Sequence, residues 1–254
     1  MIEIRDRDYR KINLKTWKYP AGEIGYELDL DNRWKGALAF VKITCWFESS
    51  DELLLLRMLQ DHLDDELGCH VEIIFPYLPA SREDRRVTKN HSFGLDTICG
   101  LYKHITSFDV HNMNTATHNV KNKDPIKQIT QAIVDCKPGG LIAPDKGAAE
   151  RYNFPYTAFG VKQRDVDGNI TKYELNTINI KQEKLLIIDD ICDGGRTFIE
   201  LAKLLPGKEL YLYVSHGIFS KGFEELKKYY KHIYTTDSYK GERDNEFVTE
   251  YGCL

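Results

Sequence analysis

A short stretch that joins an apolar run to a glycine-rich turn constrains the fold of this chain more than any other feature. Four consecutive aliphatic residues, 185–188, are followed by Asp189 and Asp190 and shortly afterwards by two glycines. A short run of this kind predicts a strand buried on both faces, which is typical of parallel sheets covered by helices. Apolar residues at helical spacing follow the turn and predict a helix. We therefore expect a strand–turn–helix unit of an α/β fold.

The turn itself is suited to a phosphorylated ribose. At the start of the expected helix, backbone N–H groups lack partners within the helix and favour an anion, as does the helix dipole. Arg196 adds a cation, Thr197 adds a hydroxyl, and the two aspartates can accept hydrogen bonds from sugar hydroxyls or bind a hydrated metal ion. An ordinary corner with solvated acids is the alternative for this stretch alone. The candidate ribose-phosphate site comprises Asp189, Asp190, Asp193, Gly194, Gly195, Arg196 and Thr197.

Expected strands and helices alternate along the rest of the chain, which predicts parallel sheets wound on both faces, with ligands at the carboxyl ends of strands. The first series is a strand at 38–47, a helix at 49–67 opened by a Ser49–Glu52 capping box, a strand at 70–75, a helix at 93–103 and a strand ending at His111. The second is a helix at 125–136, strands at 140–143 and 157–161, an arm at 165–172, a strand at 184–191, a helix at 197–205, a strand at 209–215, a helix at 221–230 and a strand at 232–236. The polar stretch between the series indicates two doubly wound domains, 1–120 and 121–254.

Composition excludes several classes of protein. The 254 residues carry a formal charge of −4, without the basic excess that nucleic-acid binding needs. No apolar run approaches the roughly 20 residues of a membrane span, and no N-terminal segment resembles a signal peptide. The six cysteines lack the paired spacing of a zinc site and are expected to be free thiols. We expect a cytoplasmic protein that binds neither nucleic acid nor a membrane.

Six further segments fall in a characteristic order along the chain. They are WKYPAGE from Trp17, SSDELLLL from Ser49, YLPASREDRR from Tyr77, FDVH from Phe108, PDKG from Pro144 and VKQR from Val161. Together with the glycine turn, they resemble the segments of ribose-phosphate pyrophosphokinases, a family with the type I phosphoribosyltransferase (PRTase) fold. Each segment is weak alone, and their common order over nearly the whole chain carries the resemblance.

The resemblance implies a Mg²⁺-dependent transferase that moves the β,γ-diphosphoryl group of ATP to the anomeric hydroxyl of a 5-phosphorylated ribose and releases AMP, in nucleotide or NAD biosynthesis or salvage. It implies ATP binding by Tyr19, Glu23, Arg82, Glu83 and Asp84. It also implies a pyrophosphate loop of Asp145, Lys146 and Gly147, magnesium binding by His111 and Asp145, and catalysis by Lys162 and Arg164. The last two residues are two apart on a strand, so they are expected to point to one side, at the base of a hairpin arm with residues 167–169 at its tip.

The resemblance also implies a homo-oligomer, a dimer or larger, in which Tyr19 and Glu23 reach the ATP site of a neighbouring subunit. His216 resembles a family histidine near the sugar site, with a hydrogen-bonded structural role as the alternative. Because the chain begins close to the Trp17 segment, we expect no strand ahead of that segment.

One departure from the family pattern concerns the acceptor. The family's phosphate loop has the pattern DTxGT, whereas this chain has a glycine at position 194 and Arg196 before Thr197. A guanidinium is a planar fork suited to more than one phosphate oxygen. We therefore expect either ribose 5-phosphate or ADP-ribose as the acceptor, and ADP-ribose is what a resemblance to the phage-type ADP-ribose pyrophosphate synthetases implies. A phosphoribosyltransferase that consumes phosphoribosyl diphosphate (PRPP) and a catalytically silent regulatory homologue are the alternative functions.

Overall fold

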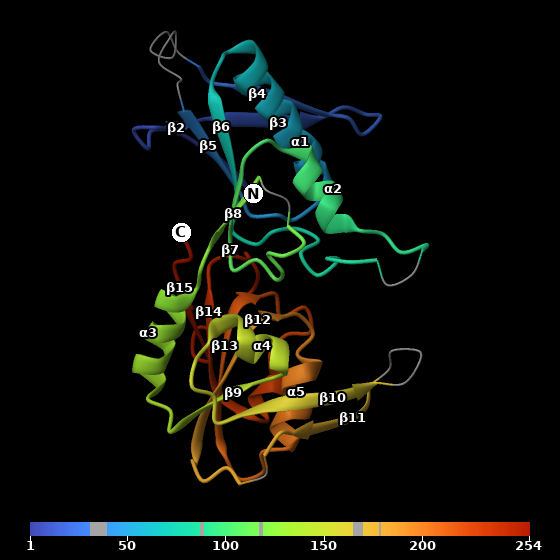
Figure 1. Ribbon diagram of the computed structural model, residues 1–254. Helices are drawn as coiled ribbons and strands as arrows, with labels where there is room; N and C mark the ends of the chain where they lie inside the picture. The colour runs from blue at the N-terminus through green and yellow to red at the C-terminus, as the bar shows by residue number, and fades with distance from the viewer. Residues whose placement is uncertain (31–39, 87–88, 117–118, 165–169, 178) are drawn as a thin grey trace. The chain divides into compact units, whose positions relative to one another are not determined.

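The computed structural model describes the chain from 1 to 254 except residues 31–39, 87–88, 117–118, 165–169 and 178 (Figure 1). It divides into two compact units, Met1–Lys123 together with Leu254, and Asp124–Cys253. The boundary expected after residue 120 falls within strand β8 (Val120–Lys123), close to this division. The sequence did not reveal β8 because Val120 is its one buried residue.

Unit 1 contains a six-stranded sheet in the order β2-β1-β5-β6-β7-β8. Its other strands are β1 (Ile2–Asp6), β2 (Lys11–Ile12), β5 (Phe40–Cys45), β6 (His70–Phe75) and β7 (Ile105–Phe108). Strands β5 to β8 are parallel, whereas β1 pairs antiparallel with both β2 and β5. The expectation that no strand precedes Trp17 is therefore wrong. Buried Ile4 anchors β1 to the sheet core.

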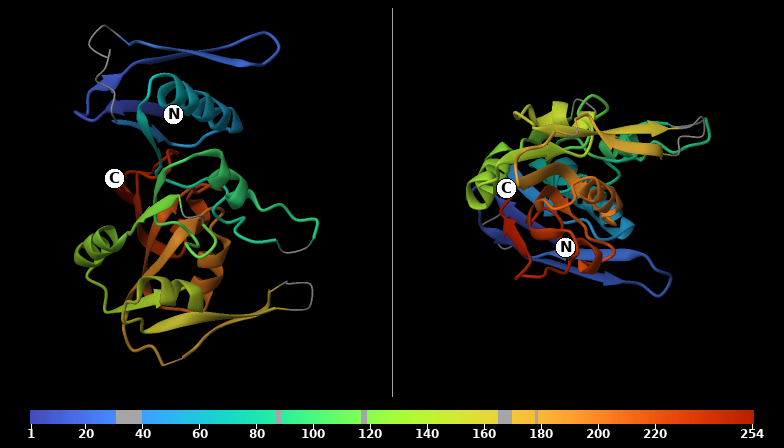
Figure 2. Two further views of the ribbon diagram at one scale, coloured as in Figure 1. Left: turned by 45° about the horizontal axis from the view of Figure 1, so that its top comes forward. Right: turned by 90° about the horizontal axis from the view of Figure 1, so that it is seen from below.

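A separate hairpin of β3 (Leu14–Lys18) and β4 (Ile24–Leu28) extends from unit 1 (Figure 2). The Trp17 ring lies over Gly25, where a Cβ would approach the ring to 2.5 Å. Glycine at this position therefore lets the indole lie flat across the partner strand. The turn of this hairpin carries two of the expected ATP-binding residues.

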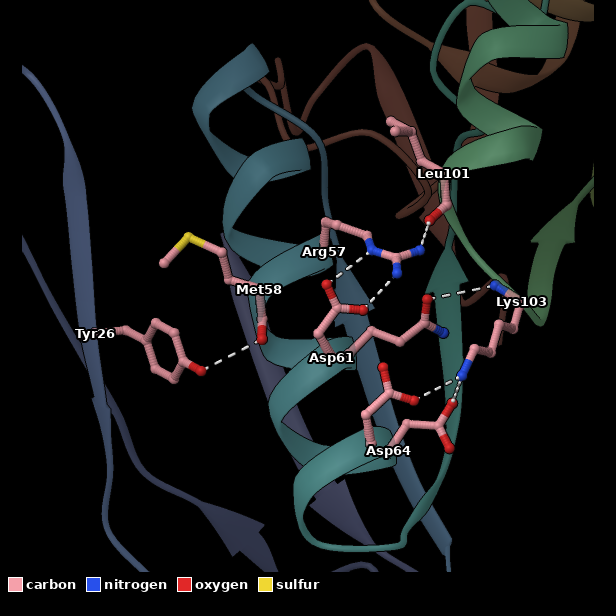
Figure 3. Close-up of polar contacts among 9 residues, drawn as sticks. Tyr26, Arg57, Met58, Asp61, Asp64, Leu101 and Lys103 are labelled. Atoms are coloured by element: carbon pink, nitrogen blue, oxygen red, sulfur yellow. Dashed lines mark hydrogen bonds and ion pairs between the residues drawn. The ribbon is translucent and has the colours of Figure 1, made fainter.

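Helix α1 (Ser50–Gln60) continues into the π-helix η2 (Asp61–Glu66). At its start, the Glu52 carboxylate accepts backbone N–H groups from Glu48 at 2.7 Å and Ser49 at 3.4 Å, as a capping box predicts. Figure 3 shows how this helix is tied to the end of helix α2 (Gly94–Leu101) and to the segment after it: Arg57 donates to the Leu101 carbonyl at 2.8 Å, and Lys103 donates to Asp64 at 2.7 Å.

Both helices cover the same face of the unit 1 sheet. Strands β5, β6 and β7 lie side by side in chain order, and right-handed crossovers that run in one direction place their helices on one face. Val41 and Ile43 of β5 accordingly share a core with residues of α1 and α2. Lys42 and Thr44 alternate onto the other face and are partly exposed. In the described part of unit 1, α1 and α2 therefore lie on one face of the sheet.

Unit 2 contains a seven-stranded sheet in the order β11-β10-β9-β12-β13-β14-β15. The strands are β9 (Gly140–Ala143), β10 (Ala158–Arg164), β11 (Ile170–Leu175), β12 (Lys184–Cys192), β13 (Glu209–Gly217), β14 (Tyr230–Thr236) and β15 (Val248–Tyr251). The helices are α3 (Ile126–Cys136), α4 (Lys146–Tyr152), α5 (Arg196–Lys203) and α6 (Glu224–Lys227). Strand β11 pairs antiparallel with β10, and the other neighbouring strands are parallel. Strand β15 was not expected, and α6 is shorter than expected.

The chain reverses its direction of travel across this sheet. Strand β10 lies on one side of β9, whereas β12, β13 and β14 follow on the other side. The reversal places helices on both faces: Leu185 and Ile187 of β12 share a core with α5, whereas Leu186 and Ile188 share another with α3. The α/β fold class is thus confirmed, and β12 is the doubly buried strand that the sequence predicts. Ligands of such sheets bind beyond the carboxyl ends of the strands at the reversal, which here are β9 and β12.

Candidate active site

Asp145 follows β9 and begins α4. One carboxylate oxygen caps this helix by accepting the Ala148 N–H at 3.0 Å, and the other lies 3.0 Å from the Lys162 ammonium of β10. Burial opposes ionisation, but the Ala148 hydrogen bond and the Lys162 charge outweigh it and hold the pKa of Asp145 below its usual range. Asp145 is therefore an anion in contact with a cation. The other two residues of the expected pyrophosphate loop, Lys146 and Gly147, form the exposed first turn of α4.

Lys162 is confined by an aromatic ring that sequence reasoning missed. Its side chain is 16% exposed, and its ammonium lies 5.5 Å from the ring centre of Tyr173, the residue directly opposite on β11. The Tyr173 hydroxyl donates to the Pro144 carbonyl at 2.8 Å. A Cβ on Gly160 would lie 2.3 Å from that carbonyl oxygen, so glycine is what allows β10 to pass so close to the loop.

The expected hairpin arm is present as β10 and β11. Its antiparallel register runs from Gly160 opposite Leu175 to Arg164 opposite Ile170, with an irregularity beside Gln163. The backbone of Arg164 ends β10, but its side chain and the expected tip at 167–169 lie outside the described residues. Whether Lys162 and Arg164 point to one side stays a prediction.

The two consecutive acids at the end of β12 differ in environment. Asp190 is 4% exposed and lies 2.6 Å from a guanidinium nitrogen of Arg151, a residue of α4 that sequence reasoning did not single out. Asp189 is partly exposed. The protein around Asp189 and the negative charges of Asp190 and Asp145 raise the pKa of Asp189 well above its usual range. Asp190 is thus paired with a cation, whereas Asp189 is hydrogen-bonded to the neighbouring Asp190 and has no cation among the groups that shift its pKa.

The glycine turn forms the start of α5 as expected. Gly195 is its N-cap, with φ +76°, a backbone conformation that favours glycine. Asp193 is held by the Ser220 hydroxyl, which donates to it at 2.5 Å. Arg196 is exposed and Thr197 is partly exposed on the first turn of the helix. The Lys221 side chain, also missed, lies 3.4 Å from where a Cβ on Gly194 would be.

The packing of His216 and of the cysteines favours structural roles for them. His216 is buried, and its Nδ1 lies 2.8 Å from the Ser238 hydroxyl, which favours the structural alternative. All six cysteines are buried and free, as expected. Burial raises the pKa of Cys192 in the glycine turn, so this thiol is not activated as a nucleophile.

In unit 1, the structure brings together Tyr19 and Glu23, two expected ATP-binding residues. They lie at the two ends of the β3–β4 turn, where the Tyr19 N–H donates to the Glu23 carbonyl at 2.9 Å. Both are exposed at this tip. Such side chains are available to a partner molecule, as the resemblance implies.

Two other expected segments of unit 1 also meet. Arg82, Glu83 and Asp84 lie on the loop after β6, and Asp84 accepts a hydrogen bond from the Asn112 amide at 2.7 Å. Asn112, which sequence reasoning missed, directly follows the expected metal ligand His111. The loop after β6 and the loop after β7 are therefore linked at the carboxyl ends of their strands.

A groove of about 450 Å³ lies elsewhere in unit 1 and contains none of the predicted site residues. Its lining includes Phe40, His70, Glu72, His104 and Lys121, near the amino ends of β5 to β8. Ligands of parallel sheets bind at the opposite, carboxyl ends, so we give this groove no part in the candidate site.

A metal cage made by the protein alone is not found in the described parts of the chain. They hold no group of three or more His, Cys, Asp or Glu side chains that could bind an ion. Magnesium is commonly bound by one or two carboxylates together with substrate phosphates and water. Asp145, an ionised and partly exposed carboxylate, fits that mode. No helix in the same described parts is long and apolar enough to cross a membrane.

Comparison with known proteins agrees with the expected family. No protein-family model matches the chain. The ribose-phosphate pyrophosphokinase of Pyrococcus abyssi is 28% identical over 94% of this chain and 89% of its own length. Those of Pyrococcus furiosus and Thermococcus kodakarensis are 28% and 25% identical, over 85% and 87% of this chain and 82% and 83% of their own lengths.

The fold is also that of a solved relative. The crystal structure of phosphoribosylpyrophosphate synthetase from Mycobacterium smegmatis matches with a TM-score of 0.77 and 18% identity, covering 96% of this chain and 87% of the other. The likeness confirms the PRTase-type fold, and the named relatives support the expected class, a diphosphokinase-type transferase. The chain is therefore a relative of the ribose-phosphate pyrophosphokinases in sequence and in fold.

Proposed function

We propose that this protein is a Mg²⁺-dependent diphosphotransferase. It moves the β,γ-diphosphoryl group of ATP to the anomeric hydroxyl of ribose 5-phosphate or ADP-ribose and releases AMP, in nucleotide biosynthesis or NAD salvage. The observation that carries the proposal is the grouping of Asp145, Lys162 and the Asp189–Asp190 pair around the strand reversal of unit 2. The relatives of this chain bear the name of that activity.

The chemistry asks the protein mainly for positioning and charge neutralisation, because the acceptor hydroxyl attacks the β-phosphorus in line. Lys162 is placed to stabilise charge that grows on the transferring group. Its contact with Asp145 keeps its ammonium beside the pyrophosphate loop. We assign Arg164 the same task on the strength of the family resemblance.

Asp145 is our candidate magnesium-binding residue in unit 2, and we assign His111 the same task on the strength of the family resemblance. When bound, the ion neutralises phosphate charge. The Lys162 ammonium now occupies one Asp145 oxygen, so an incoming cation competes with it for that carboxylate. Nucleotide binding is assigned to Tyr19, Glu23, Arg82, Glu83 and Asp84, as the resemblance implies.

The glycine turn gives the acceptor its phosphate site. Backbone N–H groups at the start of α5 suit the 5′ phosphate. Arg196 and Lys221 add two exposed cations near the turn. A second phosphate, as in ADP-ribose, would give this additional charge a partner, and this observation supports ADP-ribose as the second candidate acceptor.

Assembly and location are proposals of the same kind. The exposed Tyr19 and Glu23 at the hairpin tip suit contact with a neighbouring subunit in a homo-oligomer. The protein is proposed to work in the cytoplasm, without nucleic acid or membrane as a partner.

The test is an incubation with ATP, magnesium and either ribose 5-phosphate or ADP-ribose, with AMP release and product mass as readouts. We expect AMP and an acceptor heavier by one diphosphoryl group. A phosphoribosyltransferase that consumes PRPP would instead form no product here, and it would release pyrophosphate when it is supplied with PRPP and a base. A protein that binds ATP but forms no product with either acceptor would be the silent homologue.

A further inference from the structure

We propose that Arg151 divides the acid pair of β12 into two unequal roles. Arg151 fixes Asp190 as a buried structural anion and leaves Asp189 as the carboxyl group that contacts the hydroxyls of the acceptor sugar. Arg151 is then a positioning residue, and Asp190 is not a sugar ligand. This inference rests on the proposed function and refines the assignment of both acids to the sugar.

The two acids leave β12 toward different layers of unit 2. Side chains alternate along a strand, so Asp189 continues the row of Leu185 and Ile187, which packs with α5. Asp190 continues the row of Leu186 and Ile188, whose core includes Tyr152 at the end of α4. The glycine turn opens α5, so the Asp189 side chain starts from the sheet face of the phosphate site and the Asp190 side chain starts from the face of α4, while the two carboxyl groups stay within hydrogen-bond reach of each other.

Burial separates the two acids further. A carboxylate as buried as Asp190, at 4% exposure, is strongly destabilised unless a cation pairs with it. Arg151 supplies that cation at 2.6 Å, and its own side chain is 21% exposed. The paired oxygen of Asp190 is already occupied by a donor, whereas Asp189 retains exposed surface through which a sugar can reach it.

The charge balance of the pair also depends on Arg151. Adjacent carboxyl groups repel when both are ionised, so one takes up a proton unless a cation offsets the charge. Arg151 contacts Asp190, so the negative charge resides there. Asp189 can then offer a sugar hydroxyl either a proton or an acceptor oxygen.

Helix α4 connects this ion pair to the pyrophosphate loop. Asp145 caps the first turn of α4, and Arg151 projects from its last turn to Asp190. One short helix therefore sets the position of the loop relative to the end of β12. A change at Arg151 is expected to move both.

The test compares Asp189→Asn, Asp190→Asn, Arg151→Met and Arg151→Lys in the full chain, by acceptor KM, kcat and thermal unfolding. Asp189→Asn should raise the KM for ribose 5-phosphate or ADP-ribose about threefold to tenfold, the range for a hydrogen bond between neutral groups, with Tm nearly unchanged. Asp190→Asn should show the reverse, a Tm lower by several degrees and a smaller rise in KM.

Arg151→Met should lower Tm most, because it leaves a buried carboxylate without its cation, and adding Asp190→Asn should restore part of that loss. Arg151→Lys keeps a cation and should restore most of the acceptor affinity. Equal KM effects of Asp189→Asn and Asp190→Asn, or unchanged acceptor KM and Tm in Arg151→Met, would overturn the proposal.

Calorimetric titration with ribose 5-phosphate and with ADP-ribose separates this inference from the proposed function. A wild type that binds an acceptor but releases no AMP would contradict the transfer reaction, while the ranking of the variants in binding would still test Arg151. A wild type that binds neither acceptor would overturn the sugar role of Asp189 and the proposed function together. In that case, a Tm effect would identify Arg151 only as part of a structural ion pair.

Discussion

The sheets of the two units contain similar parallel strands but different strand orders. In unit 1, β5 to β8 follow one another in a single direction, and the two helices share one core. In unit 2, the direction reverses between β9 and β12, and two cores lie on opposite faces of β12. The reversal collects Asp145 and the acid pair at one place, whereas Arg82 and Glu83 lie exposed on a loop of unit 1. Strand order, more than strand content, thus decides where a pre-formed site arises.

The largest expected effect is the loss of unfolding free energy when a buried side chain is removed from the core of either unit. Leu186→Ala and Ile187→Ala remove fully buried side chains from opposite faces of β12, and each should lower the free energy of unfolding by about 2–5 kcal/mol. In unit 1, Ile43→Ala should cost as much, but Thr44→Ala on the partly exposed face should cost at most about 1 kcal/mol. Denaturant unfolding measures all four. A large loss of unfolding free energy in Thr44→Ala would show that this second face of the unit 1 sheet is also covered.

The next effect concerns the unit 2 arm. Lys162→Ala and Arg164→Ala should each lower kcat about a hundredfold or more while ATP affinity changes little, because a group that stabilises the transition state contributes little to ground-state binding. Lys172→Ala is the matched control, since this exposed arm cation pairs with Glu174 and is the cross-strand partner of Gln163, not of Lys162. Parallel losses of ATP affinity and rate would make Lys162 and Arg164 binding contacts instead.

The sequence correctly predicted the strands that consist of continuous runs of apolar residues. Strands β9 and β12 are such runs, and both were found. The polar edge strand β8 escaped because its burial pattern resembles that of a loop. Arg151, Tyr173 and Lys221 escaped for a different reason: their place near the site depends on which helix or strand lies beside which loop, and a single sequence does not show this.

The third prediction asks whether the glycine turn of unit 2 is built for more than one phosphate. Arg196→Gly should cost about 1.5–3 kcal/mol in kcat/KM with ADP-ribose, the range for a hydrogen bond to a charged group, and little with ribose 5-phosphate. Adding Gly194→Thr rebuilds the family loop and places a side chain against Lys221. The double variant should therefore shift preference toward ribose 5-phosphate. An unchanged ratio of the two kcat/KM values would reduce Arg196 to a surface charge.

The smallest expected effect concerns the magnesium requirement. Asp145→Asn should raise the magnesium concentration for half-maximal activity about tenfold, because it removes an ionised oxygen ligand from an ion held mainly by phosphates and water. His111→Ala, in the other unit, should raise it less, since a histidine that orients the ion contributes less than a carboxylate that binds it. Asp135→Asn is a matched control, because this exposed acid of α3 is bonded to Gln131 and belongs to none of the candidate sites. Magnesium titrations at saturating ATP give the three values. If neither Asp145→Asn nor His111→Ala changes the magnesium requirement, the assignment of magnesium binding to these two residues is wrong. If only His111→Ala changes it, the magnesium ligand lies in unit 1, which contradicts the view that the reactive groups all lie in unit 2.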